Sequence, residues 1–155
     1  KVYRKQGGDE LVVASGGKIT VESGGVMQES GVVASFSMSV AAGGSNVSEV
    51  TITAKDGNGD TVAGVHNFDV WLSDATTGAG LTGTTASGTV QAKASSGAVL
   101  GTLTSKKALR VQTLATGIFI LEITDTAKTA FVVCAQAPGN GKTVVGLTLA
   151  TGNYG

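Results

Sequence analysis

The sequence has little charge and no excess of either sign. Charged residues make up 14% of the 155 residues, and 11 basic residues balance 11 acidic ones. Binding to phosphate backbones or to anionic lipid depends on an excess of positive charge. Neither a nucleic acid nor a membrane surface is therefore the expected partner.

Cysteine and long apolar runs are also scarce. Cys134 is the only cysteine, so no disulfide can form within the chain, and the framework of a small disulfide-rich domain is excluded. No run of about 18 apolar residues is present, which is the length that a membrane-spanning helix needs. The start of the sequence also lacks the basic, apolar and small-residue order of a signal peptide.

The residues that are abundant favour strands and turns. Aromatic residues contribute only 5% although hydrophobic residues reach 41%, and glycine occurs 24 times. Val, Ile and Thr fit a pleated sheet, while glycine supplies the positive φ angles of tight turns. Glu, Lys, Gln and Arg, which favour helices, are few. We therefore expect an all-β protein.

The chain divides into two parts by composition. Residues 1–45 are rich in Gly and Ser, and a Ser-Gly step recurs at Ser15, Ser23 and Ser30 with short apolar pieces between the steps. A flexible linker would not carry such apolar pieces, since they lose free energy in water. We expect residues 1–45 to be an extended β segment for assembly, and residues 46–155 to be a separate β domain.

The second part has the strand spacing of a two-sheet sandwich. Strand-like runs are separated by turn residues every 8 to 15 positions. The clearest alternation buries Val50, Ile52 and Ala54 on one face, and Phe68, Val70 and Leu72 form a second set. Residues 76–87 are expected to form an irregular loop or a weak edge strand. The predicted strands cover residues 47–55, 66–73, 89–94, 109–112, 118–124, 131–135 and 145–149.

Two short motifs resemble ligand loops but fit turns better. The Gly-Lys-Thr of residues 141–143 ends like a phosphate-binding loop, yet Gln136 stands where that loop needs its first glycine. The sequence predicts a hairpin turn there. Asp56, Asn58 and Asp60 have the spacing that begins a calcium loop, but Thr61 and Asn67 replace its glycine and its bidentate glutamate. A turn is the first interpretation of this motif, and a weak cation site is the second.

Three single residues could carry chemistry, and each has a simpler structural interpretation. His66 has no second His or Cys nearby and is expected to be a partly exposed strand residue. Cys134 is expected to be a small buried hydrophobic residue. Trp71 is expected to anchor a core or an interface, with a sugar-stacking platform as the alternative. We therefore expect no enzyme, no metal site and no cofactor.

Residues 50–72 resemble a known family of domains. The stretches VTITAKDGNGDTVAGV and FDVWL are similar to the opening hairpin of bacterial immunoglobulin-like domains, and TGIFILEIT is similar to a later turn and strand of the same family. The resemblance covers about residues 47–150. It implies an immunoglobulin-like β-sandwich.

The layout of the whole chain resembles a second family. A Gly/Ser-rich start containing LVVASGGKITVESGG, joined to a small β domain, is similar to tailed-phage head decoration and head fibre proteins. That resemblance implies a homotrimer on the outer surface of the capsid, with the major capsid protein as its partner. It implies no catalytic residue.

The repeat supports such an assembly on physical grounds. Rungs of seven or eight residues are too short to close a coil alone, and they leave unpaired edges and uncovered apolar faces. Three chains wound about one axis could pair those edges. The expected assembly and capsid contacts are Leu11, Val13, Ile19, Val21, Val26, Met27 and Val32.

Two function classes therefore compete. The first is a structural virion protein that decorates and cements a phage capsid. The second is an immunoglobulin-like adhesion module of a bacterial surface protein or fibre that binds a glycan or a receptor.

Overall fold

The computed structural model describes residues 2–4, 11–13, 31–137 and 144–155. These residues form strands and one short 3-10 helix, η1 (Thr151–Asn153). The expectation of an all-β protein is confirmed. The strands are β1 (Val2–Arg4), β2 (Leu11–Val13), β3 (Ser35–Ala42), β4 (Val47–Lys55), β5 (Asn67–Ser73), β6 (Val90–Ala92), β7 (Ala98–Thr104), β8 (Ala108–Gln112), β9 (Ile118–Thr124), β10 (Val132–Gln136) and β11 (Val144–Thr148).

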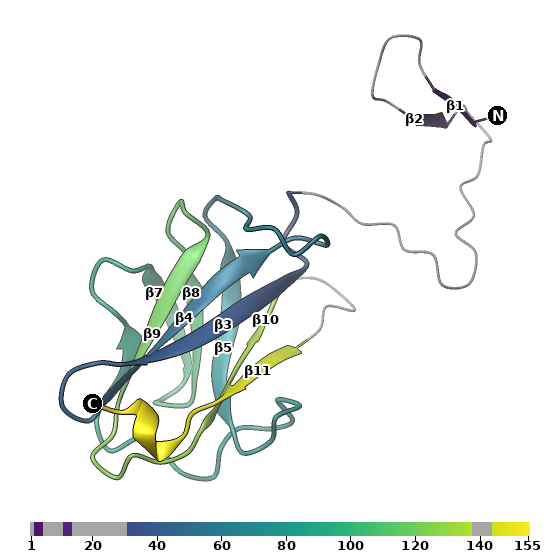
Figure 1. The fold of residues 1–155 in the computed structure, drawn as a ribbon. Coiled ribbons are helices and arrows are strands. Elements are labelled where there is room, and N and C mark those ends of the chain that lie inside the picture. Colours follow the sequence, from purple (N-terminus) through teal and green to yellow (C-terminus); the bar gives the residue numbers. More distant parts are fainter. Residues whose placement is uncertain (1, 5–10, 14–30, 138–143) are drawn as a thin grey trace.

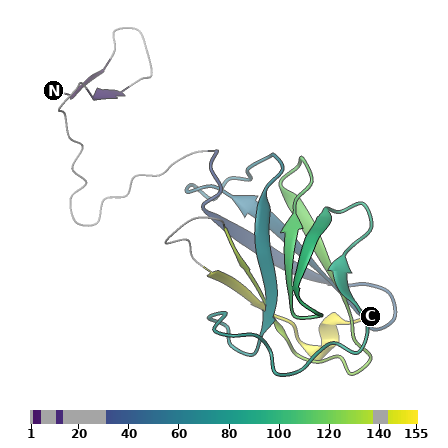
Figure 2. The same cartoon turned by 180° about the vertical axis from the view of Figure 1, so that it is seen from behind.

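Two antiparallel sheets pack face to face as a sandwich (Figure 1). The first has five strands in the order β11-β10-β5-β8-β7, and the second has four in the order β3-β4-β9-β6. Seen from behind, β5 and the β7–β8 hairpin lie in front of the four-stranded sheet (Figure 2). A separate antiparallel pair joins β1 to β2.

Alternation of apolar and polar residues explains the central strands. In β4 every second residue is buried, and Val50, Ile52 and Ala54 are fully buried. The same pattern in β9 turns Phe119 and Ile123 inward. The apolar residues 118–124 predict a strand that is covered on both faces, but the outward residues of β9 are only half-buried.

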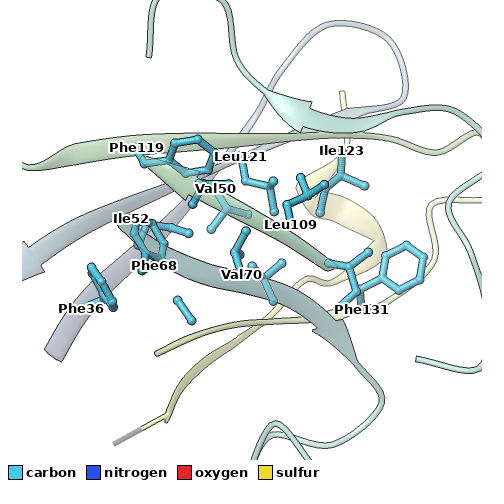
Figure 3. Packing of buried hydrophobic residues seen from close by; sticks show 14 of the residues in the cluster. Phe36, Val50, Ile52, Phe68, Val70, Leu109, Phe119, Leu121, Ile123 and Phe131 are labelled. Carbon is cyan, nitrogen blue, oxygen red and sulfur yellow. The ribbon is translucent and has the colours of Figure 1, made fainter. Parts of the chain in front are cut away.

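The core lies between the two inner faces of the sheets (Figure 3). Three aromatic rings from three strands meet there. The ring centroids of Phe36 and Phe68 lie 4.4 Å apart, and Phe68 meets Phe119 edge-on at 5.8 Å. Such tilted and edge-on pairs are the favoured geometries of aromatic side chains.

The sandwich begins earlier than the predicted boundary between residues 45 and 46. Strand β3 pairs with β4 along its whole length, from Ser35 opposite Lys55 to Ala42 opposite Ser48. Its Phe36 is 4% exposed and Val33 is also buried in the core. Residues 33–45 therefore belong to the sandwich, since their apolar side chains complete its core.

Strand β10 is buried on both faces. The sequence predicted a strand here, over residues 131–135. Val133 and Ala135 face the core, while Val132 and Cys134 are covered from outside. The loop that follows β5 provides part of this cover, since Gly78 lies against the Cys134 sulfur. Residues 76–87 thus form an irregular loop, as expected, with no strand of their own.

Candidate functional site

The structure describes only some of the residues expected to make assembly contacts. Leu11 and Val13 lie in β2, opposite Arg4 and Val2 of β1. Val32 is 45% exposed, directly before the buried Val33. The remaining four, Ile19, Val21, Val26 and Met27, lie outside the described residues.

The Asp56 motif is a turn, as its first interpretation predicted. Oδ1 of Asp56 accepts hydrogen bonds from the backbone N–H groups of Asn58 and Asp60, both at 2.9 Å. Oδ2 accepts the N–H of Gly31 at 3.2 Å. This carboxylate therefore closes the turn and holds the chain just before the sandwich. Among the described residues, no three His, Cys, Asp or Glu side chains gather where they could hold a metal ion.

His66 and Cys134 have structural roles. The Nε2 atom of half-buried His66 lies 3.2 Å from the carbonyl oxygen of Val62, just before β5 begins. Cys134 is fully buried, and burial raises the pKa of its thiol to about 11. The thiol therefore stays protonated and unreactive at neutral pH. The prediction for Cys134 is confirmed. His66 is partly exposed, as predicted, but it lies just before β5 and not in a strand.

The Gly-Lys-Thr motif lies outside the described residues, but the strands around it are described. Gln136 of β10 pairs with Val144 of β11 in an antiparallel register. A phosphate-binding loop requires a helix after it. The strand found there agrees with a hairpin.

Trp71 lies outside the core, on the outer face of the five-stranded sheet. The alternation of β5 turns Phe68, Val70 and Leu72 inward, so Asp69 and Trp71 face outward. The expectation that Trp71 anchors the core was therefore wrong, and its role as an interface anchor stays a prediction. Trp71 is half-buried and lines a groove of about 330 Å³.

Four strands, β5, β7, β8 and β10, and the loop after β5 supply the described lining of the groove. The sheet register places Ala108 and Cys134 on either side of Trp71, and Gln136 beside Asp69. The loop after β5 and the edge strand β7 add apolar walls. The lining residues are Asp69, Val70, Trp71, Gly78, Gly80, Leu81, Leu103, Ala108 and Gln136.

An ion pair fixes the polar end of the groove. Nε and Nη2 of Arg110 donate to the two carboxylate oxygens of Asp69 at 2.9 and 3.0 Å. The hydrogen bond to Asp69, and then its charge, raise the pKa of Arg110. The side chains remain 40% exposed for Asp69 and 56% for Arg110. This two-bond geometry holds both planar groups in one orientation while leaving them open to solvent.

Hydrogen bonds to its backbone hold the loop wall in place. The indole N–H of Trp71 donates to the carbonyl of Gly78 at 3.1 Å, and the N–H of Thr82 donates to the carbonyl of Leu72 at 2.8 Å. Lys107 Nζ donates to the carbonyl of Thr82 at 2.7 Å. The loop is thus tied both to β5 and to the turn between β7 and β8.

Asp74 closes the same loop. Its carboxylate accepts the Thr82 hydroxyl at 2.6 Å and the Gly83 N–H at 2.8 Å. These bonds, with that from Thr82 the strongest, lower the pKa of Asp74. The wall of the groove is therefore preformed.

The apolar side of the groove is exposed. Leu81 is 44% and Leu103 is 52% exposed, although each is a large hydrophobic side chain. Leu103 sits at a shift in the β7–β8 register, where Thr102 pairs with Leu109 and Thr104 with Ala108. Such a bulge redirects a side chain. Together with Trp71 these leucines offer a small apolar surface beside a polar pair.

Sequence reasoning singled out Trp71 as a possible sugar-stacking platform but missed the other residues of the groove. The alternation of residues 66–73 places Asp69 and Trp71 on one face, whereas Leu81 lies in a loop without periodicity. Arg110 could be placed opposite Asp69 only from the pairing of β5 with β8, which is not local in sequence.

The comparisons with known proteins do not assign the chain to a family. No family model, curated protein or solved structure matches it. No helix among the described residues is long and apolar enough to cross a membrane.

Proposed function

We propose that this chain is a structural virion protein that decorates the outer surface of a phage capsid and cements the assembled shell. In this proposal the N-terminal segment binds the capsid and assembles the chains, and the sandwich projects outward. The partners are the major capsid protein and two further copies of the chain. The proposal assigns binding to the chain and no catalysis.

One observation carries this proposal. Among the described residues, those that build the core of the sandwich lie between Val33 and Tyr154. The Ser-Gly repeat adds the apolar residues Ile19, Val21 and Val26. In the proposal these side chains contact other chains, which removes them from water.

The low charge of the chain supports the same proposal. A protein that works alone in solution usually carries a net charge that limits association. This chain has 11 basic and 11 acidic residues and a net charge of zero. A weakly charged chain is suited to permanent packing against a shell and against its own copies.

We further propose that the sandwich is immunoglobulin-like. The order β3-β4-β9-β6 corresponds to the A-B-E-D sheet of that fold, and β11-β10-β5 corresponds to G-F-C. Strands β8 and β7 then extend the five-stranded sheet beyond β5, as the two added strands of variable-type domains extend theirs. The chain reaches them in a different sequence, since β6 precedes the β7–β8 hairpin.

Binding to the assembled shell alone would make the chain a cement. A ligand that binds one state and not another stabilises that state by an amount that grows with its concentration. A site that spans neighbouring capsomers exists only after assembly and expansion. The chain would therefore stabilise the expanded head and leave free coat protein unaffected.

The test is a pelleting assay with heads of the phage that encodes the chain. Full-length protein is mixed with expanded heads, with unexpanded procapsids or with free coat protein. We expect saturable binding to expanded heads alone, and loss of binding for residues 31–155. Equal binding of this truncated form would contradict the role of the N-terminal segment, and no binding to heads would contradict the proposal.

The groove at Trp71 favours a second candidate, the adhesion module. An adhesion module would keep its binding to cells or glycans after removal of residues 1–30. It would show no affinity for expanded heads. The full-length protein and residues 31–155 therefore distinguish the two functions in the same assays.

A further inference from the structure

The groove at Trp71 has the features of a site for a small neutral ligand with hydroxyl groups. We propose that it binds a neutral glycan, with the apolar face of a sugar ring against Trp71 and sugar hydroxyls on Asp69 and Arg110. This inference does not rest on the capsid role, because every described residue that lines the groove belongs to the sandwich.

Apolar and polar groups lie side by side in this groove. A sugar ring has C–H groups on one face and hydroxyls around its edge, so it needs both kinds of contact. Trp71, Leu81 and Leu103 provide apolar surface, while Asp69 and Gln136 line the same groove. Amphipathic aromatic side chains suit such a mixed surface.

The ion pair gives the groove hydrogen-bonding capacity without net charge. A carboxylate has about four acceptor positions and a guanidinium has five N–H donors. Arg110 donates one N–H to each of the two carboxylate oxygens of Asp69, at 2.9 and 3.0 Å. Further N–H donors of the guanidinium and further acceptor positions of the carboxylate remain for a ligand. Adjacent hydroxyls of a sugar can donate to the carboxylate and accept from the guanidinium.

Charge selects among ligands. Asp69 is the one ionisable side chain among the described residues that line the groove, and Arg110 neutralises it. An anionic ligand would meet the carboxylate, and a cationic ligand would have to compete with the guanidinium. A neutral glycan is not repelled by the carboxylate and does not compete with the guanidinium for it.

The size and rigidity of the groove fit a short stretch of glycan. Its volume of about 330 Å³ lies at the lower end of the range for ligand sites, roughly 300–1,000 Å³. The Trp71 indole is held by its hydrogen bond to Gly78, and Asp74 holds the loop wall. Because these walls are preformed, less conformational entropy is lost when a ligand binds.

The lone tryptophan provides the measurement. Because Trp71 is the only tryptophan in the chain, a change in intrinsic fluorescence reports on this groove. Maltotriose, mannotriose, cellotriose and chitotriose are titrated into the full-length protein, with trigalacturonate as the charged comparison. We expect at least one neutral trisaccharide to shift the emission saturably, with a Kd on the order of 1 mM or tighter.

Two variants and a control locate the site. Asp69→Asn keeps the shape of the side chain but removes its charge, and Leu103→Ser removes part of the apolar wall. We expect each to weaken binding about tenfold or more. Glu122→Gln makes the same chemical change on the outer face of the other sheet, where Glu122 accepts a hydrogen bond from Gln91 at 2.8 Å, and should bind as the parent protein does.

Several outcomes would overturn the inference. They are a fluorescence signal that stays unchanged at about ten times the expected Kd, binding that Asp69→Asn leaves intact, and a preference for trigalacturonate. Binding of the apolar dye anilinonaphthalene sulfonate in place of any sugar would indicate a hydrophobic docking site instead. Residues 31–155 should bind sugar as well as the full chain does, so failure here is distinct from failure to bind capsids.

Discussion

Gly78 shows how single residues set the shape of the groove. Its φ angle is +73°, and a β-carbon there would lie 2.7 Å from Cγ1 of Val144 and 3.0 Å from Cζ2 of Trp71. Distances this short force neighbouring side chains to move. The loop can therefore lie against Trp71 only because residue 78 has no side chain.

Replacing Gly78 by alanine should destabilise the sandwich. We expect Gly78→Ala to lower the free energy of unfolding by about 2–4 kcal/mol, which combines left-handed backbone strain with overpacking. Gly80→Ala is the matched control, because Gly80 has a φ of +72° but open space around it. Urea denaturation should show a loss of about 1–2 kcal/mol for that control. Equal losses for both variants would show that the contact with Trp71 has no effect.

Asp125 is a buried carboxylate that organises two loops. It is 1% exposed and accepts hydrogen bonds from the backbone N–H of Ser87 at 3.0 Å and of Thr129 at 2.7 Å. Burial acts to raise its pKa, but the hydrogen bonds from Thr129 and Ser87 outweigh burial and hold the pKa well below its usual value. Folding thus favours the charged form.

The lowered pKa of Asp125 predicts how stability depends on pH. A carboxylate with a depressed folded-state pKa stabilises the fold above its unfolded pKa, near 4, and this contribution is lost as the pH falls further. We expect the free energy of unfolding to be constant from about pH 7 to 5 and to fall below about pH 4. Asp125→Asn should be less stable than the parent protein at pH 7, and the difference should shrink at pH 3. A difference that is unchanged between these two pH values would contradict this assignment.

At the scale of elements, the alternation of apolar and polar residues decides which strands can be predicted from the sequence. Strand β4 was predicted with its observed bounds, because its buried residues alternate with half-buried ones and three of the four buried residues, Val50, Ile52 and Ala54, are apolar. Strand β7 was missed, since it is an edge strand exposed on both faces and its register shifts twice. Because neither face of β7 is buried, its fold does not require apolar and polar residues to alternate.

Strand β3 was missed for another reason. Phe36, Met38 and Val40 do alternate, but Ser and Ala lie between them and the Gly/Ser-rich composition resembles that of the preceding repeat. Its assignment depends on pairing with β4, which is a tertiary contact. The groove is also tertiary, because it needs the loop after β5 to fold over the sheet beside Leu103.

The inward face of β4 should carry much of the stability. Ile52 is fully buried at the centre of the core, and Ile52→Ala should lower the free energy of unfolding by about 3–4 kcal/mol. Ile120 is the control, because it lies on the outward, half-buried face of the neighbouring strand β9. Ile120→Ala should cost roughly half as much or less by the same denaturation assay. The reverse order would contradict the assignment of inner and outer faces.

At the scale of the whole molecule, the proposal assigns assembly to the N-terminal segment and independent folding to the sandwich. Under this proposal the full chain should form a trimer, with three times its 15.3 kDa mass, by sedimentation equilibrium. Residues 31–155 should remain folded and become monomeric, because they contain every core residue that the structure describes. A full-length protein that is a stable monomer would count against the intertwined repeat.

Electron microscopy tests the proposed capsid decoration most directly. Under the proposal a phage encodes the chain, and expanded heads of that phage are imaged with and without saturating full-length protein. We expect added density at regular positions of the lattice, with the sandwich projecting outward from the shell. Heads that stay bare at saturating protein would contradict it.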